Sequence, residues 1–123
     1  MAKQPTFGNG KICYIEIPAI DIPTSAKFFE TVFGWNVRTD NHGFAAFDDV
    51  VGEVSGMWVT GREPMGKAGL LISIMVDDAA TAVKLIEANG GIIIKPVDKE
   101  SSEITAHFTD PAGNLWGIYQ HGG

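Results

Sequence analysis

The chain has 123 residues, of which 45% are hydrophobic and 20% are charged, and its formal net charge is −6. This length fits a single domain, and the composition is that of a folded protein rather than a disordered one. Only 9 residues are Lys or Arg, so the sequence predicts neither a nucleic-acid partner nor a membrane partner. No segment reaches the roughly 20 consecutive apolar residues of a membrane-spanning helix. The single cysteine, Cys13, cannot form an internal disulfide, and we expect a cytoplasmic protein in which this thiol lies on the apolar face of a strand.

The first half of the chain predicts a strand, a helix and three more strands. Residues 11–18 are rich in β-branched and aromatic side chains and end at a proline, which indicates a strand. Apolar residues then recur at helical spacing as far as Gly34, and Asp21 or Thr24 can cap the start of this helix. Turn residues separate the next three runs. We therefore expect further strands at 35–40, 44–47 and 51–60.

The second half repeats this order after a stretch rich in turn residues. A strand at 70–76 is expected to precede a helix that Asp77 or Asp78 caps and Gly90 ends. Strands should follow at 92–97, 103–109 and 114–120. We therefore predict one domain, 1–123, made of a first βαβββ module at 10–60, a linker at 61–68 and a second module at 69–121.

Matches between the two halves indicate a tandem duplication. The spacing between Asp21 and Gly34 is the same as that between Asp77 and Gly90. In the last strand of each half, residues 52–58 align with residues 113–119, with glycines at the first and fifth places and an aromatic residue at the seventh. Two curved sheets of this kind, facing each other, would leave a cleft between them.

Five short motifs occur in sequence between residues 10 and 120. They are Ile15-Glu16-Ile17-Pro18, Phe28-Phe29-Glu30-Thr31-Val32-Phe33-Gly34-Trp35, Val76-Asp77-Asp78, Asn89-Gly90-Gly91 and Asp110-Pro111-Ala112-Gly113-Asn114. Together they resemble the glyoxalase/bleomycin resistance/extradiol dioxygenase superfamily, also called the vicinal oxygen chelate superfamily, and within it the small predicted lactoylglutathione-lyase-related proteins. The resemblance implies an α+β fold in which tandem βαβββ modules form a curved mixed sheet with a central cleft. It also implies a homodimer, and it leaves open whether the modules pair within one chain or between chains.

The same resemblance implies where a metal ion would bind. In metal-dependent members the ligands lie on the first and last strands of each half, and the matching positions here are Tyr14, Leu70 or Leu71, Gly56 and Gly117. Only the tyrosine among them could ligate a divalent ion. We therefore predict no metal site and no cofactor. A divalent-metal-dependent lyase, isomerase or dioxygenase of the same superfamily is the alternative.

Three polar residues are candidates for chemistry. Glu16 and Tyr14 share one face of the first strand. In a cavity, Glu16 would serve as a general base or a polar anchor, and Tyr14 would bind or stack on a ligand. On a solvated face, the glutamate would instead pair with a cation and the tyrosine would be structural. His107 is a candidate acid–base residue, but Ala106 and Phe108 form an equally plausible inward-facing pair, which would turn the histidine outward.

The last strand of each half supplies the expected ligand-binding surface. Trp58 and Tyr119 share the strand parity of Gly56 and Gly117, so all four should border the cleft. Glycines there would let a ligand approach the backbone, and the rings would hold a flat or apolar molecule; alternatively, the rings fill the cleft or seal a dimer interface. The predicted function is binding of a small, flat or apolar molecule without a bound metal, by sequestration or by metal-independent catalysis. Any activity is expected to be of the lyase or isomerase type related to lactoylglutathione lyase.

Overall fold

The computed structural model describes residues 5–67, 69–98 and 103–120. In this part of the chain, helices and strands follow the order predicted from the sequence. The first module contains β1 (Tyr14–Pro18), α1 (Ile22–Phe33), β2 (Asn36–Thr39), β3 (Ala45–Asp48) and β4 (Ser55–Val59). The second contains β5 (Ser73–Val76), α2 (Ala79–Ala88), β6 (Ile92–Lys95), β7 (Ile104–Thr109) and β8 (Leu115–Gln120). The α+β fold of two βαβββ modules is therefore confirmed, while residues 68 and 121, at the ends of the expected linker and second module, lie outside the described residues.

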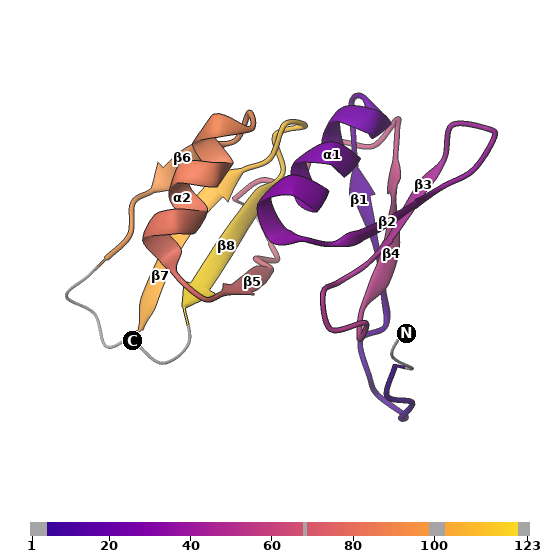
Figure 1. Cartoon of the computed structure of the whole chain (residues 1–123), viewed down its shortest axis with the longest axis horizontal. Helices are drawn as coiled ribbons and strands as arrows, with labels where there is room; N and C mark the ends of the chain where they lie inside the picture. The colour runs from indigo at the N-terminus through magenta and orange to yellow at the C-terminus, as the bar shows by residue number, and fades with distance from the viewer. Residues whose placement is uncertain (1–4, 68, 99–102, 121–123) are drawn as a thin grey trace.

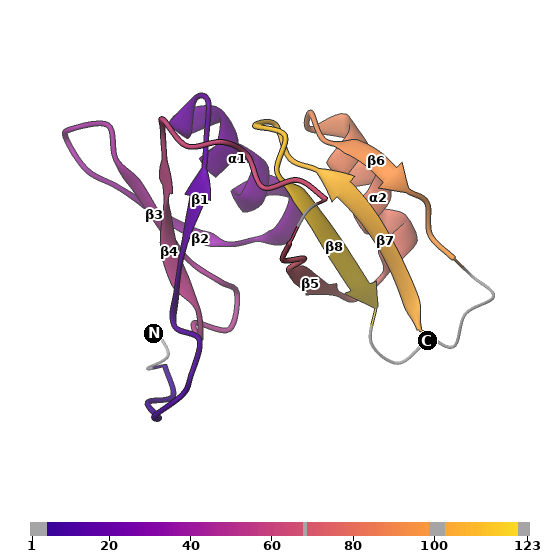
Figure 2. The ribbon, with the colours of Figure 1, turned by 180° about the vertical axis from the view of Figure 1, so that it is seen from behind.

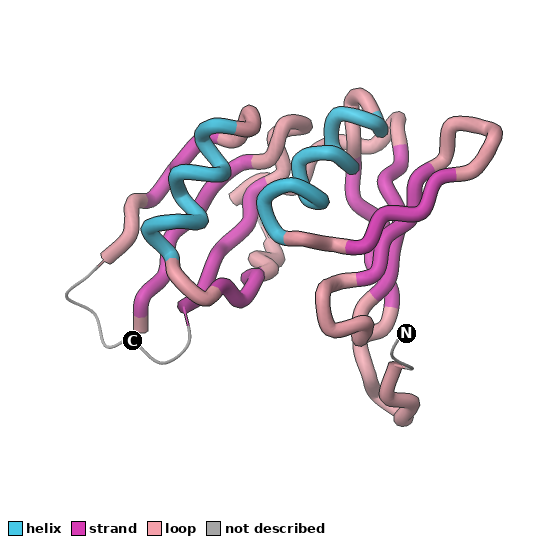
Figure 3. The backbone as a smooth tube through the Cα atoms, viewed as in Figure 1, coloured by secondary structure: helices cyan, strands magenta, loops and turns pink. Residues whose placement is uncertain are grey.

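Each module forms its own four-stranded sheet. The strand orders are β1-β4-β3-β2 and β5-β8-β7-β6. In both sheets the first and last strands of the module run parallel and the remaining neighbours run antiparallel. The curved mixed sheet that the resemblance implied is thus present as two separate sheets, which loops connect (Figure 3).

Side-chain caps fix where the two helices begin, and glycines fix where they end. Asp21 caps α1 and Asp78 caps α2, each accepting a hydrogen bond from the backbone N–H three residues on, at 3.1 and 3.0 Å. The sequence left Asp77 and Asp78 as alternatives, and the structure selects the second. Gly34 and Gly90 follow the helices with φ of 73° and 96°, a left-handed conformation that favours glycine. None of the described helices is long and apolar enough to cross a membrane.

Helix α1 lies between the two sheets and belongs to the core of both (Figure 1). The Phe29 ring is fully buried, with its centroid 5.9 Å from that of Trp58 in β4 and 5.2 Å from that of Trp116 in β8. Its neighbour Phe28 reaches Phe108 in β7 at 6.0 Å. The helix-facing side of each sheet is therefore buried. We call the opposite side of each sheet its open face, and the two open faces do not face each other within the chain (Figures 1 and 2).

A buried polar cluster ties the second module to the first. The Asp110 carboxylate accepts bonds from two backbone N–H groups of its own turn and from the side chains of Asn114 and Trp116. Asn114 in turn donates to the carbonyl oxygen of Pro18 at 2.7 Å and accepts from the backbone N–H of Met65 at 2.9 Å. Through these bonds the β7–β8 turn holds both the end of β1 and the linker.

Candidate functional site

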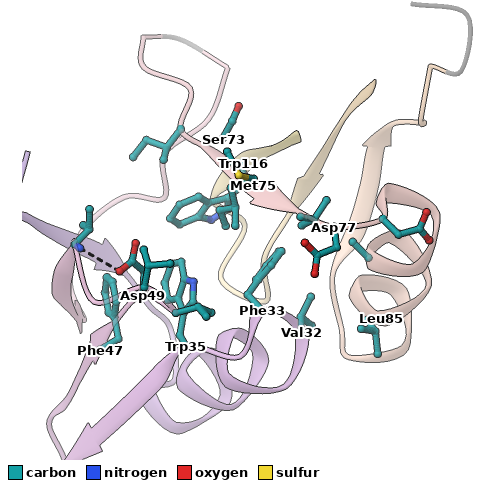
Figure 4. Close-up of a pocket in the computed structure, with 18 of the residues that line it drawn as sticks. Val32, Phe33, Trp35, Phe47, Asp49, Ser73, Met75, Asp77, Leu85 and Trp116 are labelled. Atoms are coloured by element: carbon teal, nitrogen blue, oxygen red, sulfur yellow. Dashed lines mark hydrogen bonds between the residues drawn. The ribbon is translucent and has the colours of Figure 1, made fainter. Parts of the chain in front are cut away.

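A cavity of about 740 Å³ opens between the two modules, on the helix-facing side of the sheets (Figure 4). One end of α1, the β3–β4 loop, strand β5 and one side of α2 form its walls. Most lining residues are apolar, with aliphatic side chains as the largest group, and the aromatic ones are Phe33, Trp35, Phe47 and Trp116. Such a volume lies within the roughly 300–1,000 Å³ of typical small-molecule sites, and such sites are also predominantly apolar.

The aromatic wall of this cavity is rigid because its rings stack in the core. Gly34 turns the chain after α1, so that Trp35 folds back beneath the helix. The Trp35 ring then lies between Phe29 and Phe47, with centroids 4.6 and 4.5 Å away and interplanar angles of 17° and 20°. Trp116 meets Trp35 edge-on at 6.2 Å. Trp35, Phe47 and Trp116 are almost completely buried, so they form an ordered support behind the cavity. The half-buried Phe33 is the aromatic side chain that a molecule in the cavity can contact most fully.

The polar groups of the cavity are few and acidic. Asp49 and Asp77 lie toward opposite ends of the cavity (Figure 4). Asp78, the next residue after Asp77, also lines it. Asp49 accepts hydrogen bonds from two backbone N–H groups of the β3–β4 loop at 2.8 and 3.1 Å. Thr81 adds a hydroxyl group, whereas the Ser73 hydroxyl lies against Gly117 on the open face of the second sheet. None of the described residues that line the cavity is Lys, Arg, His or Cys.

Tyr14 and Glu16 lie outside this cavity, on the open face of the first sheet. The Glu16 side chain makes an ion pair with Arg62 from the linker, and 36% of its surface stays exposed. The structure thus shows the cation-paired, partly solvated arrangement that the sequence left as one of two possibilities. Tyr14 is exposed at the start of β1. Cys13, expected on the apolar face of the strand, precedes β1 and is also exposed, which corrects that expectation.

The facing expected for Gly56 and Trp58 is wrong. Trp58 is fully buried beneath α1, and its ring centroid lies 5.0 Å from that of Phe47. Gly56 lies on the same buried side, where a Cβ atom would come within 1.9 Å of the Ile15 carbonyl oxygen and 2.6 Å of the Phe47 ring. This glycine is needed for close strand packing and does not border a cleft.

Gly117, Tyr119 and His107 lie together on the open face of the second sheet. Gly117 pairs with His107 across β7 and β8, while the alternating residues Ala106 and Phe108 are buried on the helix side. The His107 side chain is therefore turned outward, which is the arrangement that the sequence predicts if Ala106 and Phe108 face inward. The predicted site residues are consequently divided between the core and two open faces that point in different directions (Figure 2).

An extra residue in the β3–β4 loop explains why Gly56 and Trp58 face the core and not a cleft. The backbone N–H of Asp49 donates to the carbonyl oxygen of Val54 at 2.9 Å, and that of Asp110 donates to the oxygen of Asn114 at 3.0 Å. Both aspartate carboxylates also accept backbone N–H bonds from their loops. Gly52 and Gly113 occupy the same position after the two aspartates. The hydrogen bond that closes the β3–β4 loop therefore lies one residue further along the chain than the one that closes the β7–β8 loop.

Beyond these loops the repeat alignment shifts by one residue. Trp58 corresponds to Ile118, and Met57 corresponds to Gly117, whereas the sequence match had aligned the tryptophan with Tyr119. Because side chains alternate along a strand, a shift of one residue moves each of them to the opposite face of the sheet. The glycines and aromatics that matched in sequence therefore do not match in space.

Comparison with known proteins identifies the family. A model of the family described as Glyoxalase/Bleomycin resistance protein/Dioxygenase superfamily matches residues 11–118. The chain belongs to this superfamily. A "Glyoxylase-like domain-containing protein" of Didymella fabae is 30% identical to it over 121 residues, which is 89% of this chain and 93% of that protein.

Solved structures of the superfamily share the fold. The chain is similar to a glyoxalase/bleomycin resistance protein/dioxygenase family enzyme from Burkholderia phytofirmans PsJN, with a TM-score of 0.71, 19% identity and coverage of 90% and 98% of the two chains. It is also similar to TioX from Micromonospora sp. ML1, with a TM-score of 0.66, 22% identity and coverage of 91% and 99%. At these identities the likeness concerns the fold alone.

The positions where metal-dependent members carry ligands do not fit a divalent ion here. Gly56 and Leu71 offer no side-chain donor, and the corrected counterpart of Gly117 in the first module is Met57, a weak thioether donor. Tyr14 is the one oxygen donor of the set. Among the described residues, no three His, Cys, Asp or Glu side chains come together in a way that could hold a metal ion.

The residues of the apolar cavity were not recognised as a site from the sequence. In the sequence, Phe33 fits the buried stripe of a helix and, with Trp35, a family motif, while Phe47 and Trp116 fall in expected strands. The available signal was the concentration of aromatic residues at the end of α1, where a helix stops and the chain reverses. The sequence does not show that α1 lies between the two sheets. This position of α1 brings β5 and α2 close to the aromatic residues.

Proposed function

We propose that this protein binds a small molecule with a flat or apolar body in the cavity between its modules, without a resident metal ion. The observation that carries the proposal is the cavity itself, with a volume of about 740 Å³ and a wall of stacked aromatic rings. An apolar ligand would gain from leaving water, and a rigid wall would lose little entropy on binding it.

Sequestration fits this cavity better than catalysis. Among its described lining residues, the candidates for proton transfer are carboxylates and hydroxyls, and the carboxylates of Asp49 and Asp78 already hold a loop and cap a helix. The proposed catalytic residues Glu16 and His107 lie on open faces outside the cavity. A lyase or isomerase activity, with or without a divalent metal, therefore remains the second candidate.

Calorimetric titration with 2-naphthylmethanol, a flat neutral probe, tests the proposal. We expect saturable binding of one probe per chain. Leu85→Gln places an amide in the lining and should weaken binding about three- to tenfold, because apolar contact is lost. Ile20→Gln, at an exposed position outside both the cavity and the end strands of the sheets, should leave the affinity unchanged. Absence of saturable binding, or equal loss in both variants, would contradict the proposal.

We also propose that the protein is a homodimer. Strands β1 and β5 are end strands of their sheets. Large apolar side chains are exposed on or just before them, namely Ile12, Tyr14, Leu70, Leu71 and Met75. An apolar, unpaired strand edge is a template for pairing with another chain, and a second copy of this chain supplies the same two edges.

Light scattering on the eluting protein measures the oligomeric state. The chain has a mass of 13.2 kDa, and we expect twice that value for the wild type. Leu71→Lys should produce monomers, since lysine at a strand edge opposes pairing. Ile20→Lys, in the exposed segment between β1 and α1, is the matched control and should remain dimeric. A monomeric wild type would refute the dimer. The proposed compartment is the cytoplasm, because an exposed, unpaired thiol such as Cys13 is typical of a reducing environment.

A further inference from the structure

We propose that the ligand of this cavity is an amphiphilic cation, in which a flat apolar body carries a protonated nitrogen. The inference rests on the proposed function and names the chemical class of ligand for the same site. The inference follows from the negative charges that line the cavity, because charges of one sign attract molecules of the opposite sign. The apolar surface alone would not favour a cation over a neutral molecule.

Every ionisable group among the described lining residues is an aspartate. They are Asp49, Asp77 and Asp78, and no lining residue among those described carries a positive charge. The carboxylates lie toward both ends of the cavity, with the apolar floor between them (Figure 4). A low-dielectric wall strengthens the interaction of such charges with a bound ion, and the net charge of −6 acts in the same direction.

Asp77 is the carboxylate best placed to meet a ligand. Within the described part of the chain it accepts no hydrogen bond and makes no ion pair, whereas Asp49 holds the β3–β4 loop and Asp78 caps α2. A ligand whose protonated amine meets Asp77 could also pack its apolar body against Val32 and Phe33, the half-buried side chains at the end of α1. The cavity thus offers an uncommitted anion next to an apolar and aromatic surface.

The start of α2 does not reverse this preference. A helix N-terminus is positive and can bind an anion through free backbone N–H groups. Here the N–H of Ala79 donates to the side chain of Gln120 at 2.8 Å, and that of Thr81 donates to Asp78 at 3.0 Å. These two N–H groups are therefore already bonded to oxygen atoms of the chain itself, and the acceptor of the Thr81 N–H is a carboxylate.

Three probes with the same naphthyl body isolate the effect of charge. They are 2-naphthylmethylamine, which is protonated at neutral pH, the neutral 2-naphthylmethanol and the anionic 2-naphthylacetate. In calorimetric titrations at low salt, we expect the amine to bind about three- to tenfold more tightly than the alcohol, and the acetate to bind more weakly than the alcohol. Raising the salt from roughly 0.02 M to roughly 0.5 M should narrow these differences, because the charges are screened.

Matched variants connect the preference to one carboxylate. Asp77→Asn should bring the affinity for the amine toward that for the alcohol and leave the alcohol's affinity unchanged. Glu87→Gln removes the same charge from α2 outside the cavity and should preserve the preference. Tighter binding of the acetate than of the amine, or an unchanged preference in Asp77→Asn, would overturn the inference. Binding of all three probes with equal affinity would overturn it while leaving the proposed function intact, and binding of none would overturn both.

Discussion

Replacing Asp110 with asparagine should destabilise the fold although the two side chains have the same shape. The carboxylate accepts four N–H bonds at 2.9–3.0 Å, two to each oxygen, from Ala112, Asn114 and Trp116. An asparagine keeps one oxygen for one pair of donors. Its amide nitrogen then faces the other pair, which is a contact between donors only.

The magnitude follows from the burial of these donors. Asn114 and Trp116 are almost fully buried, so water cannot replace the lost acceptor, and each unsatisfied donor costs about 1–3 kcal/mol. A smaller gain opposes this loss. Burial raises the pKa of Asp110 because it disfavours the charged carboxylate, and a neutral asparagine avoids this desolvation cost. The four N–H bonds act in the other direction, since they favour the ionised form. We expect a net loss of about 2 kcal/mol or more, a large share of the roughly 5–15 kcal/mol that stabilises a typical domain.

Urea unfolding followed by tryptophan fluorescence measures this loss. Asp77→Asn makes the same chemical change at an exposed position and should alter the free energy of unfolding by less than about 0.5 kcal/mol. The bond from Asn114 to the oxygen of Pro18 would lose its support in Asp110→Asn, so hydrogen exchange should also rise at the end of β1. If Asp110→Asn were as stable as the wild type, the carboxylate would not organise this turn, and the reasoning would fail.

Three further predictions test other parts of the structure. Gly56→Ala should lower the free energy of unfolding by about 3 kcal/mol or more, because the new Cβ meets the backbone oxygen of Ile15; Gly117→Ala should cost less, because its nearest contact is the movable Ser73 hydroxyl, and urea unfolding of both variants checks the order. Glu16→Gln should change stability by less than about 1 kcal/mol and leave probe binding intact, since its partly exposed ion pair with Arg62 lies outside the cavity; lost binding at unchanged stability would restore Glu16 as the ligand anchor. The Ser55 hydroxyl, followed by Arg38 and Asn36, lowers the pKa of Asp48, so its contribution is present above the unfolded pKa of about 3.9 and is lost as pH falls through the lower folded value. Thermal melting across acidic pH should therefore show a shallower loss for Asp48→Asn than for the wild type, and parallel curves would contradict this.

Local signals in the sequence were sufficient for the order of elements. Asp21 and Gly34 bound a helix by the chemistry of their own side chains and backbone, and the Asp110 turn closes as its residue types predict. These features depend on neighbours a few residues away. The family resemblance then supplied the tandem arrangement, which the strand order of each sheet confirms.

The faces of the last strands could not be predicted in the same way. One extra residue in the β3–β4 loop reverses the facing of Trp58, and a matching pattern of glycines and aromatics concealed it. The cavity depends on contacts that are more distant still. Glu16 finds its partner Arg62 in the linker, and Trp35 meets Trp116 only because α1 lies between two sheets. Local periodicity carries no information about such pairings.

Chemical-shift mapping with 2-naphthylmethanol tests most directly whether the cavity between the modules is the ligand site. The three tryptophans give separate indole N–H signals, which single Trp→Phe variants assign. Trp35 and Trp116 line the cavity and Trp58 does not. We therefore expect saturable shifts of the first two signals, with Trp58 and the open-face residues Tyr14 and Tyr119 nearly unchanged. Shifts confined to the open faces, with the signals of Trp35 and Trp116 unmoved, would contradict this account.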